Sequence, residues 1–415
     1  MNGYAVIVLV ALVGEYALSL VSTGLNLRAL SPAVPSEFSG VFDATRYAKS
    51  QDYTRVTSRF SLMQSTVTLV LVLAVWFLGG FDWLDRLVRG LSAGEERPIV
   101  SGFLFIGMLG LASMLSGLPF RVYRTFVIET EFGFNRTTPR TFVADLLKGT
   151  ILAVVLGGAL LAGVLAFFEW AGPLAWLWCW VATAGFVFVV QFVAPTLIMP
   201  WFNTFTPLNA GALRDALMSY ASSAEFPLQD VFVVDGSKRS SKANAFFTGF
   251  GRNKRIGLFD TLVDSHSVDE LVAVVAHEVG HYKKGHLVQG IVLQVAYLGA
   301  VFFLMSLVLH REGLFEAFYM TDISVYAGLV FFGLVFSPVE LVLSLAVQAM
   351  SRRNEFEADA FAATTTGDGK PLVTALKKLS ADTLTNLTPH PLDVFLHDSH
   401  PPVLQRITAL RAAGD

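Results

Sequence analysis

The residues best placed to do chemistry in this chain form the short run His277-Glu-Val-Gly-His281. In a helix, side chains four positions apart lie on one face, so His277 and His281 can reach a single metal ion. Glu278 would then lie beside the open position of that ion, where it can take a proton from water and return it to a leaving amine. The spacing predicts a catalytic zinc site, and the alternative is an amphipathic helix with two hydrogen-bonded histidines.

The start of this helix and the shortage of sulfur ligands narrow the prediction further. Ser267 and Glu270 form a capping-box pattern just before an apolar run, which predicts a buried helix beginning there. The 415-residue chain has eight histidines and one cysteine, Cys179, which excludes both an intramolecular disulfide and a cysteine-rich metal site. Catalytic zinc usually takes three protein ligands and a water molecule, so a third ligand must come from elsewhere in the sequence.

The best candidate for this ligand lies in an acidic segment, residues 351–361, which we expect to form a helix. Glu355 and Asp359 are four positions apart and share a face, while Glu357 points elsewhere. One carboxylate could bind the metal while the other holds the free ring nitrogen of a zinc-binding histidine. A solvated acidic face paired with the adjacent arginines fits the spacing equally well, so both interpretations stay open on spacing alone.

The composition predicts a membrane protein. Hydrophobic residues make up 53% of the chain and charged residues only 15%, well below the roughly 25% charged residues of soluble proteins. The net charge of -3 argues against a nucleic-acid partner. A membrane span needs roughly 20 apolar residues. Seven runs qualify, at about 4–24, 61–81, 99–119, 148–168, 173–197, 287–309 and 325–349.

The connecting segments predict the orientation of these spans. Because the chain crosses the membrane at each span, successive connecting segments lie on opposite sides. The segments on one side carry 25 of the 30 Lys and Arg residues, and those on the other side carry 4. Cationic loops stay in the cytoplasm, which predicts an outside N-terminus and a cytoplasmic C-terminus. The chain then divides into spans one to five (1–197), a cytoplasmic zinc-peptidase part (198–286), spans six and seven (287–349) and a cytoplasmic part completing the zinc site (350–415).

Five stretches resemble the type I CAAX prenyl protease family of integral-membrane zinc metallopeptidases. They are FVIETEFGFNRTTPRTF (126–142), DGSKRSSKANAFFTGFGRNKRIGLFDTL (235–262), HEVGHYKKGH (277–286), NEFEADAFA (354–362) and SHPPVLQRI (399–407). The resemblance implies a mainly α membrane protein with seven transmembrane helices around a large internal chamber. A discontinuous gluzincin-like zinc-peptidase domain with a small β-sheet would cap this chamber.

The same resemblance implies roles for individual residues. The implied ligands of one Zn²⁺ per chain are His277, His281 and Glu355, with Glu278 as general base and Asp359 orienting a zinc-bound histidine. The substrate would pair with an edge strand that includes Asn244, Ala245 and Phe246. His400 and Arg406 would contact the substrate or stabilise the transition state. We expect alanine at either of these two positions to spare the fold and the zinc but to slow cleavage.

The resulting prediction is a membrane zinc metalloendopeptidase acting on a peptide or protein substrate that is prenylated or membrane-associated, with membrane lipid as its other partner. Eukaryotic additions such as a C-terminal retrieval signal are not evident, so we expect a bacterial-type homologue in the inner (cell) membrane. One alternative is a heat-shock-type membrane quality-control metalloprotease, which normally has fewer spans. Another is a seven-helix transporter or receptor with a structural metal, in which Glu278 would have no role.

Overall fold

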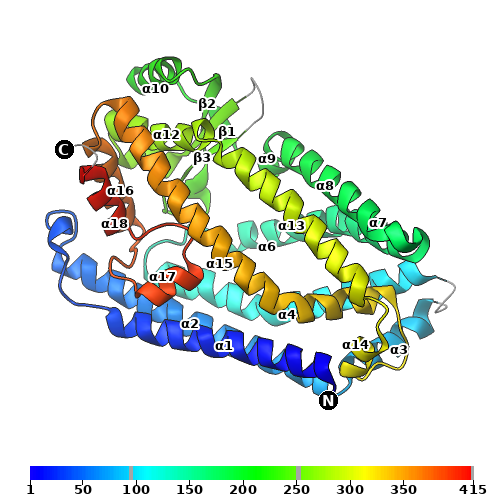
Figure 1. Ribbon diagram of the computed structural model, residues 1–415. Coiled ribbons are helices and arrows are strands. Elements are labelled where there is room, and N and C mark those ends of the chain that lie inside the picture. Colours follow the sequence, from blue (N-terminus) through cyan, green and yellow to red (C-terminus); the bar gives the residue numbers. More distant parts are fainter. Residues whose placement is uncertain (93–96, 249–253, 413–415) are drawn as a thin grey trace.

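The computed structural model describes residues 1–92, 97–248 and 254–412 of the chain (Figure 1). Seven helices in these residues are long and apolar enough to cross a membrane, which confirms the predicted number. They cover Gly3–Ala29, Ala44–Phe77, Pro98–Glu131, Pro139–Trp170, Gly172–Phe202, His286–Val308 and Val325–Thr366. Several continue beyond the predicted apolar runs, because polar turns extend the helices past the membrane-length core.

Most of these spans are regular helices, and three of them are interrupted by one π-helical segment. The uninterrupted ones are α1 (Gly3–Ala29), α2 (Ala44–Phe77), α13 (His286–Val308) and α15 (Val325–Thr366). The third span joins α4 (Pro98–Tyr123) to α5 (Glu129–Glu131) through η3 (Arg124–Ile128). The fourth joins α6 (Pro139–Leu152) to α7 (Gly158–Trp170) through η4 (Ala153–Gly157), and the fifth joins α8 (Ala175–Val193) to α9 (Met199–Phe202) through η6 (Ala194–Ile198). In η6, Pro195 lacks the N–H that a regular turn requires.

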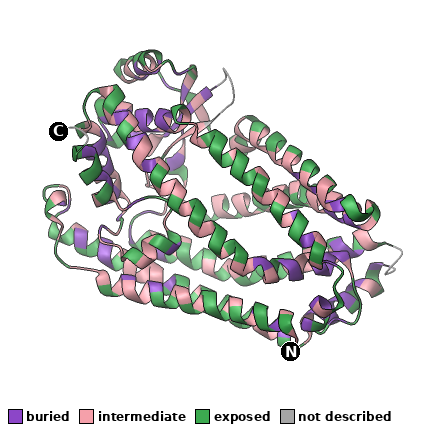
Figure 2. Cartoon of the chain, viewed as in Figure 1, coloured by how far each residue is buried: buried purple, intermediate pink, exposed green. Residues whose placement is uncertain are grey.

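Two separate hydrophobic cores hold the molecule together, one at each end of the spans (Figure 2). One core lies close to the N-terminus of the chain and is formed by α3 (Gly80–Ser92), α14 (Glu312–Ala317) and the ends of the spans that pack against them. The other core lies around α12 (Val268–Lys283) and the β-sheet. Between them, residues 61–75, 106–127 and 337–354 contain no buried side chain. The spans therefore pack against one another mainly at their ends.

The helix α3 was not predicted from the sequence, because its polar residues and glycine read as a connecting segment. Its two aspartates turn inward onto fixed partners instead of facing solvent, whereas Arg86 is largely exposed. Asp82 accepts a hydrogen bond from the backbone N–H of Thr321, and Asp85 forms an ion pair with Arg89 at 2.7 Å. The Asp82 contact joins α3 to the segment that precedes α15, and a hydrogen bond from the Tyr326 hydroxyl to Asp85 joins α3 to α15 itself. Together they close this end of the helix bundle.

A four-stranded sheet lies beside α12 in the order β1-β2-β4-β3. The strands are β1 (Phe205–Pro207), β2 (Leu228–Val234), β3 (Ala245–Thr248) and β4 (Lys254–Phe259). The sequence pattern predicts three of them, at 230–235, 244–250 and 254–260, and residues 249–250 of the second lie outside the described residues. β1 was missed because three residues give too little alternation. β2 and β4 are parallel and the other pairs are antiparallel. Among the described residues β3 pairs with β4 alone, so β3 is an edge strand, as the sequence predicted.

Short helices complete the domain around α12: α10 (Ala212–Ser223), α11 (Asp260–Ser265), α16 (Lys370–Asp382), α17 (Pro391–His397) and α18 (Val403–Ala412). The acidic segment predicted as a separate helix is instead the continuation of the seventh span, because α15 runs unbroken for 42 residues. Nothing between Pro338 and the left-handed C-cap Gly367 stops the helix, since φ of Gly367 is 75° and only there does the chain turn. A membrane span and a candidate metal ligand therefore share one helix.

Candidate metal centre

The helix α12 presents both histidines of the motif to α15. The predicted capping box at its start is present, with Ser267 accepting from the backbone N–H of Glu270 and the Glu270 carboxylate accepting from that of Ser267. Gly280 lies at the crossing of the two helices, where an added Cβ would come within 3.1 Å of the Ala358 backbone. Glycine at this position lets α15 approach closely enough to bring its carboxylates to the histidine face.

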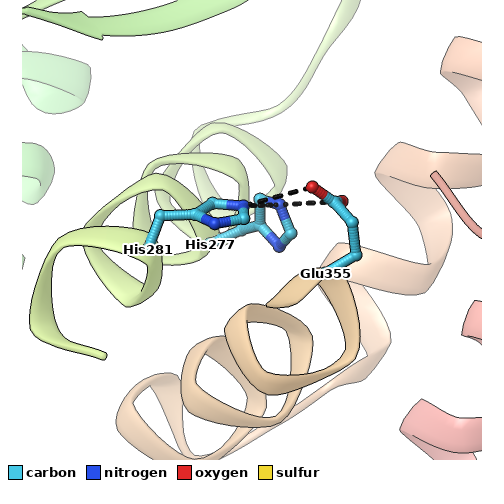
Figure 3. Close-up of side chains that lie close together, drawn as sticks. All are labelled: His277, His281 and Glu355. Carbon is cyan, nitrogen blue, oxygen red and sulfur yellow. Dashed lines mark hydrogen bonds and ion pairs between the residues drawn. The ribbon is translucent and has the colours of Figure 1, made fainter. Parts of the chain in front are cut away.

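Three side chains converge between α12 and α15 (Figure 3). The Nε2 atoms of His277 and His281 are 3.2 Å apart. Glu355 Oε2 lies 3.4 Å from His277 Nε2, and Glu355 Oε1 lies 3.3 Å from His281 Nε2. His277 and Glu355 are buried, yet Glu355 Oε2 has no hydrogen-bond partner among the described residues. A buried carboxylate that faces two imidazoles and has one oxygen without a hydrogen bond is suited to bind a cation.

These donors fit a zinc ion. For Zn–N and Zn–O distances of about 2.0–2.1 Å, a tetrahedral site separates neighbouring ligand atoms by about 3.3 Å, close to the 3.2–3.4 Å edges seen here. Two imidazoles and one carboxylate are also a donor set that zinc accepts, whereas Ca²⁺ and Mg²⁺ prefer oxygen alone. The face offers three protein ligands, which leaves a fourth position open.

Asp359 and Arg406 lie directly behind the histidines. Asp359 Oδ1 is 2.9 Å from His277 Nδ1, so the Nδ1–H can donate to the carboxylate while Nε2 stays free. Arg406 forms a two-pronged ion pair with Asp359, with distances of 2.8 Å from Nε and 2.6 Å from Nη2. Its Nη1 atom lies 3.2 Å from Glu355 Oε2. Burial lowers the pKa of His277, but hydrogen bonds to Asp359 and Glu355 outweigh this and raise it to about 9. The site therefore favours added positive charge.

Glu278 follows His277 on α12 and lies beside the three converging side chains. It lines the cavity in front of them together with both histidines and Glu355. Burial raises the pKa of Glu278, although the neighbouring imidazoles of His277 and His281 oppose this shift. A carboxyl group whose pKa is raised towards neutrality exchanges a proton more readily than one with an ordinary pKa. The position and the environment both suit a general base.

A further histidine supports the site from behind. His286 Nδ1 lies 3.0 Å from His281 Nδ1, and His286 Nε2 lies 3.3 Å from Glu357. Glu357 in turn pairs with Arg353 at 2.9 Å. The sequence left open whether the acidic segment binds a metal or is a solvated face. The solvated interpretation applies to Glu357 but not to Glu355, which is only 5% exposed.

The other predicted site residues divide between two faces of the sheet. Asn244 and Ala245 line a cavity of about 370 Å³ in front of the histidines, as do His400 and Arg406. His400 is largely exposed, with Nε2 3.4 Å from Glu355 Oε1. Phe246 is not part of this cavity: its side chain lines a smaller pocket that also includes Phe205 and Gly257. Successive side chains of a strand point to opposite faces, so only the backbone of Phe246 can face a peptide docked at the edge.

The apolar wall of the same cavity was not predicted from the sequence. It is formed by Leu262 of α11, Val274 of α12 and three leucines of α16 at positions 372, 376 and 379. The leucine spacing of four and three residues is the signal that could have marked this helix face. The same spacing is typical of ordinary core packing, so it does not indicate a cavity beside the helix. His266 is buried beside Ser265 and lies outside the site.

Comparison with known proteins gives matches over nearly the whole chain. A family model for the CAAX prenyl protease N-terminal region, with five membrane helices, matches residues 25–204. A model for peptidase family M48 matches residues 207–413. The rice protein named CAAX prenyl protease 1 homolog is 35% identical over 392 residues, covering 93% of this chain and 92% of the relative. The Saccharomyces cerevisiae CAAX prenyl protease 1 is 33% identical over 93% of this chain and 89% of the relative. The crystal structure of S. mikatae Ste24p superposes with a TM-score of 0.92 at 29% identity, covering 99% of both chains.

Proposed function

Since this chain belongs to peptidase family M48 and is a membrane metalloprotease of the CAAX prenyl protease type, we propose that His277, His281 and Glu355 bind its catalytic zinc ion. The observation that carries this proposal is the cluster of two imidazoles and one buried carboxylate, with donor atoms 3.2–3.4 Å apart and one carboxylate oxygen without a hydrogen bond. The family implies a metal, and the mixed nitrogen and oxygen donors favour zinc.

The charges around the cluster support a divalent ion. Glu278, Glu355 and Asp359 carry three negative charges when ionised, Arg406 carries one positive charge, and the histidines are neutral when they act as ligands. The site then has a net charge of about -2 that a divalent cation would balance. When bound, zinc would polarise the scissile carbonyl and make a water molecule more acidic.

Other residues of the chain then have separate roles in hydrolysis. Glu278 takes the proton from the attacking water and delivers it to the leaving nitrogen. Asp359 accepts a hydrogen bond from His277 Nδ1–H, which fixes the tautomer with a free lone pair on Nε2. His286 holds the ring of His281 in the same way from the opposite side. These partners restrict the two imidazoles to one orientation before a substrate arrives.

We propose that the substrate is an extended peptide that pairs with the free edge of β3. Backbone pairing at an edge strand recognises an extended chain with little regard to side chains. Asn244 and Ala245 would hold the peptide backbone in the cavity beside Glu278. Arg406 lines the same cavity, and its Nη1 forms an ion pair with Glu355 Oε2 at 3.2 Å, so its N–H groups can donate to the substrate or to the developing oxyanion. His400 is exposed at the mouth and can make a similar contact.

The preferred substrate, we propose, has a hydrophobic or prenylated C-terminal region. The aliphatic wall of the cavity offers an apolar side to residues near the cut, and the spans place the enzyme next to lipid. The names of the relatives also favour this class. A quality-control protease acting on misfolded membrane proteins is the weaker candidate, since the matched models describe the CAAX prenyl protease N-terminal region and not a shorter membrane part.

The chamber and the orientation are part of the same proposal. Unburied stretches in the middle of the spans leave room for a central space, and Glu15 lines a cavity of about 670 Å³ between α1, α2 and α15. Gln191 instead donates a hydrogen bond to Gln294 between the fifth and sixth spans, at 3.1 Å. The charge distribution of the loops favours a cytoplasmic zinc domain, assembled from residues 198–286 and 350–415.

The test is a Glu278→Gln variant assayed on a panel of farnesylated and unprenylated peptides. Glutamine cannot act as a base, so we expect near one zinc per chain and a loss of at least roughly 10²–10⁴-fold in rate. Zinc content would be measured by elemental analysis and cleavage by mass spectrometry. Wild-type cleavage rates in Glu278→Gln would refute the assigned mechanism. Equal turnover of a folded, polar protein and the short peptides would refute the assigned substrate class.

A further inference from the structure

The segment that leads into the edge strand, residues 236–242, is fastened to the loop 132–138 at the end of the third span. The backbone N–H of Arg136 donates to the Arg239 carbonyl at 3.0 Å, and that of Ser241 donates to the Phe134 carbonyl at 3.1 Å. Ser241 Oγ donates to the Gly133 carbonyl at 3.2 Å. Both stretches were prominent sequence motifs, and the hydrolytic chemistry assigns neither of them a role.

Arg239 anchors this segment three residues before Lys242. Its guanidinium forms a two-pronged pair with Asp145 of α6, at 2.7 and 2.9 Å. It also donates to Asn203 Oδ1 at 2.6 Å and to the Phe202 carbonyl at 2.7 Å. Paired geometry of this kind fixes direction as well as position. One end of the segment is therefore tied to the fourth and fifth spans.

Lys242 anchors the other end, two residues before Asn244. Its Nζ donates to Tyr53 Oη at 2.8 Å and forms an ion pair with Glu129 at 3.1 Å. Tyr53 Oη itself donates to the other Glu129 oxygen at 2.8 Å, which closes a three-membered network. The ammonium lies 4.3 Å from the centre of the Phe134 ring, within range of a cation–π contact. Tyr53 belongs to α2 and Glu129 to α5, so Lys242 joins the second and third spans to the peptidase domain.

The position of the anchor has a consequence for the cavity. Ala243, Asn244 and Ala245, which line it together with Glu278, follow Lys242 directly in the chain. Ala245 is also the first of the four residues of β3, which pair with β4. The side-chain period of a strand is two residues, so a slip of one residue would present the wrong backbone groups to a docked peptide. A fixed Lys242 limits that slip at the entrance to the strand.

We propose that Lys242 is a positioning residue, held by Glu129 and Tyr53, that sets the register of β3 and thereby the bond that is cut. This proposal rests on the proposed docking of the substrate along β3. Lys242 touches neither the metal ligands nor the reacting atoms. It acts by fixing the strand on which the substrate lies, so its loss changes where a peptide is cut as well as how fast.

The test compares Lys242→Met with wild-type enzyme on one defined peptide. Methionine keeps the length and apolar stem but removes the charge and its two partners. We expect an unchanged zinc content, a drop in kcat/KM of about 10- to 100-fold, as misplacement of a substrate costs, and products cut at more than one bond. Glu129→Gln should act alike, and the double variant should be no worse than either single variant. Lys238→Met, on the same segment but exposed, is the matched control and should cut like wild type.

Wild-type kcat/KM and a single, unshifted cleavage site in Lys242→Met would overturn the proposal. If that variant cannot be isolated with zinc, Tyr53→Phe decides the question, because it keeps the ring and removes one acceptor of the Lys242 ammonium. An unchanged site and rate in Tyr53→Phe would then count against it. Failure of the underlying function looks different, since the wild-type enzyme itself would then cut no peptide, or Glu278→Gln would cut as well as wild type.

Discussion

Arg406 provides the sharpest test of the electrostatics at the metal centre. The sequence assigns it to the substrate and predicts that its loss would spare the fold. Its contacts predict otherwise, because the guanidinium is 9% exposed and pairs with Asp359, which is 2% exposed, through two short hydrogen bonds. Although burial lowers the pKa of Arg406, the carboxylates around it outweigh that effect and raise it. Replacing it with methionine would leave a buried carboxylate without a countercharge.

Two estimates of the cost agree. Breaking a buried ion pair by removing one partner typically costs about 3–5 kcal/mol. Alternatively Asp359 takes up a proton, and moving a carboxyl pKa from about 3.9 to a pH of 7 corresponds to about 4 kcal/mol. A zinc ion would partly replace Arg406 as countercharge for Glu355, but Asp359 is not among the three converging donors. We therefore expect Arg406→Met to lower the free energy of unfolding by about 4 kcal/mol.

The assay is thermal and denaturant unfolding of the zinc-loaded, detergent-solubilised protein, with zinc content measured on the same samples. In the Arg406→Met/Asp359→Asn double variant the buried charge is gone, so much of the lost stability should return. Arg406→Lys should fall between, because a lysine ammonium cannot reproduce the two-pronged geometry. Wild-type stability in Arg406→Met, or a double variant no more stable than the single one, would refute this reasoning and return Arg406 to a role in substrate contact alone.

The remaining predictions concern the metal and the membrane. Glu355→Ala should lose zinc far more readily than Glu357→Ala, measured by elemental analysis after dialysis, because only Glu355 faces both imidazoles; equal loss would undo the ligand assignment. In a Cys179→Ser background, the Ile323→Cys variant should react with an impermeant thiol reagent on intact cells and the Asp368→Cys variant should not. The reason is that the loop charges predict opposite sides of the membrane for these two positions. The reverse labelling pattern would invert the predicted topology.

Helix periodicity and metal-ligand spacing carried most of what the sequence predicted correctly. The number of spans, the capping box before α12 and the shared face of His277 and His281 all follow from a 3.6-residue period and local hydrogen bonding. These signals are local, so they survive without knowledge of the tertiary structure. Glu355 and Asp359 could be proposed on the same ground, because they too lie four residues apart on one helix.

What the sequence could not predict depends on contacts between distant segments. The ion pair of Arg406 with Asp359 joins residues 47 positions apart, and the pair of Lys242 with Glu129 joins residues 113 apart. Neither spacing leaves a periodic trace. The inward-facing carboxylates of α3 were hidden for a related reason, since a charged residue reads as exposed unless its partner is known. The side-chain direction of Phe246 follows from strand alternation, but only once the face towards the metal centre is known.

The arrangement of the two cores gives the metal centre a structural role besides its chemistry. The middle of the spans contributes no buried side chain over residues 337–354, so α15 crosses this region with little lateral support. At its far end, Glu355 and Asp359 meet α12 and α18 through charged contacts. A cation at Glu355 would therefore tie α12 to the helix that begins in the opposite core. Metal binding there would contribute to the stability of the whole chain, because ligands that bind only the folded state stabilise it.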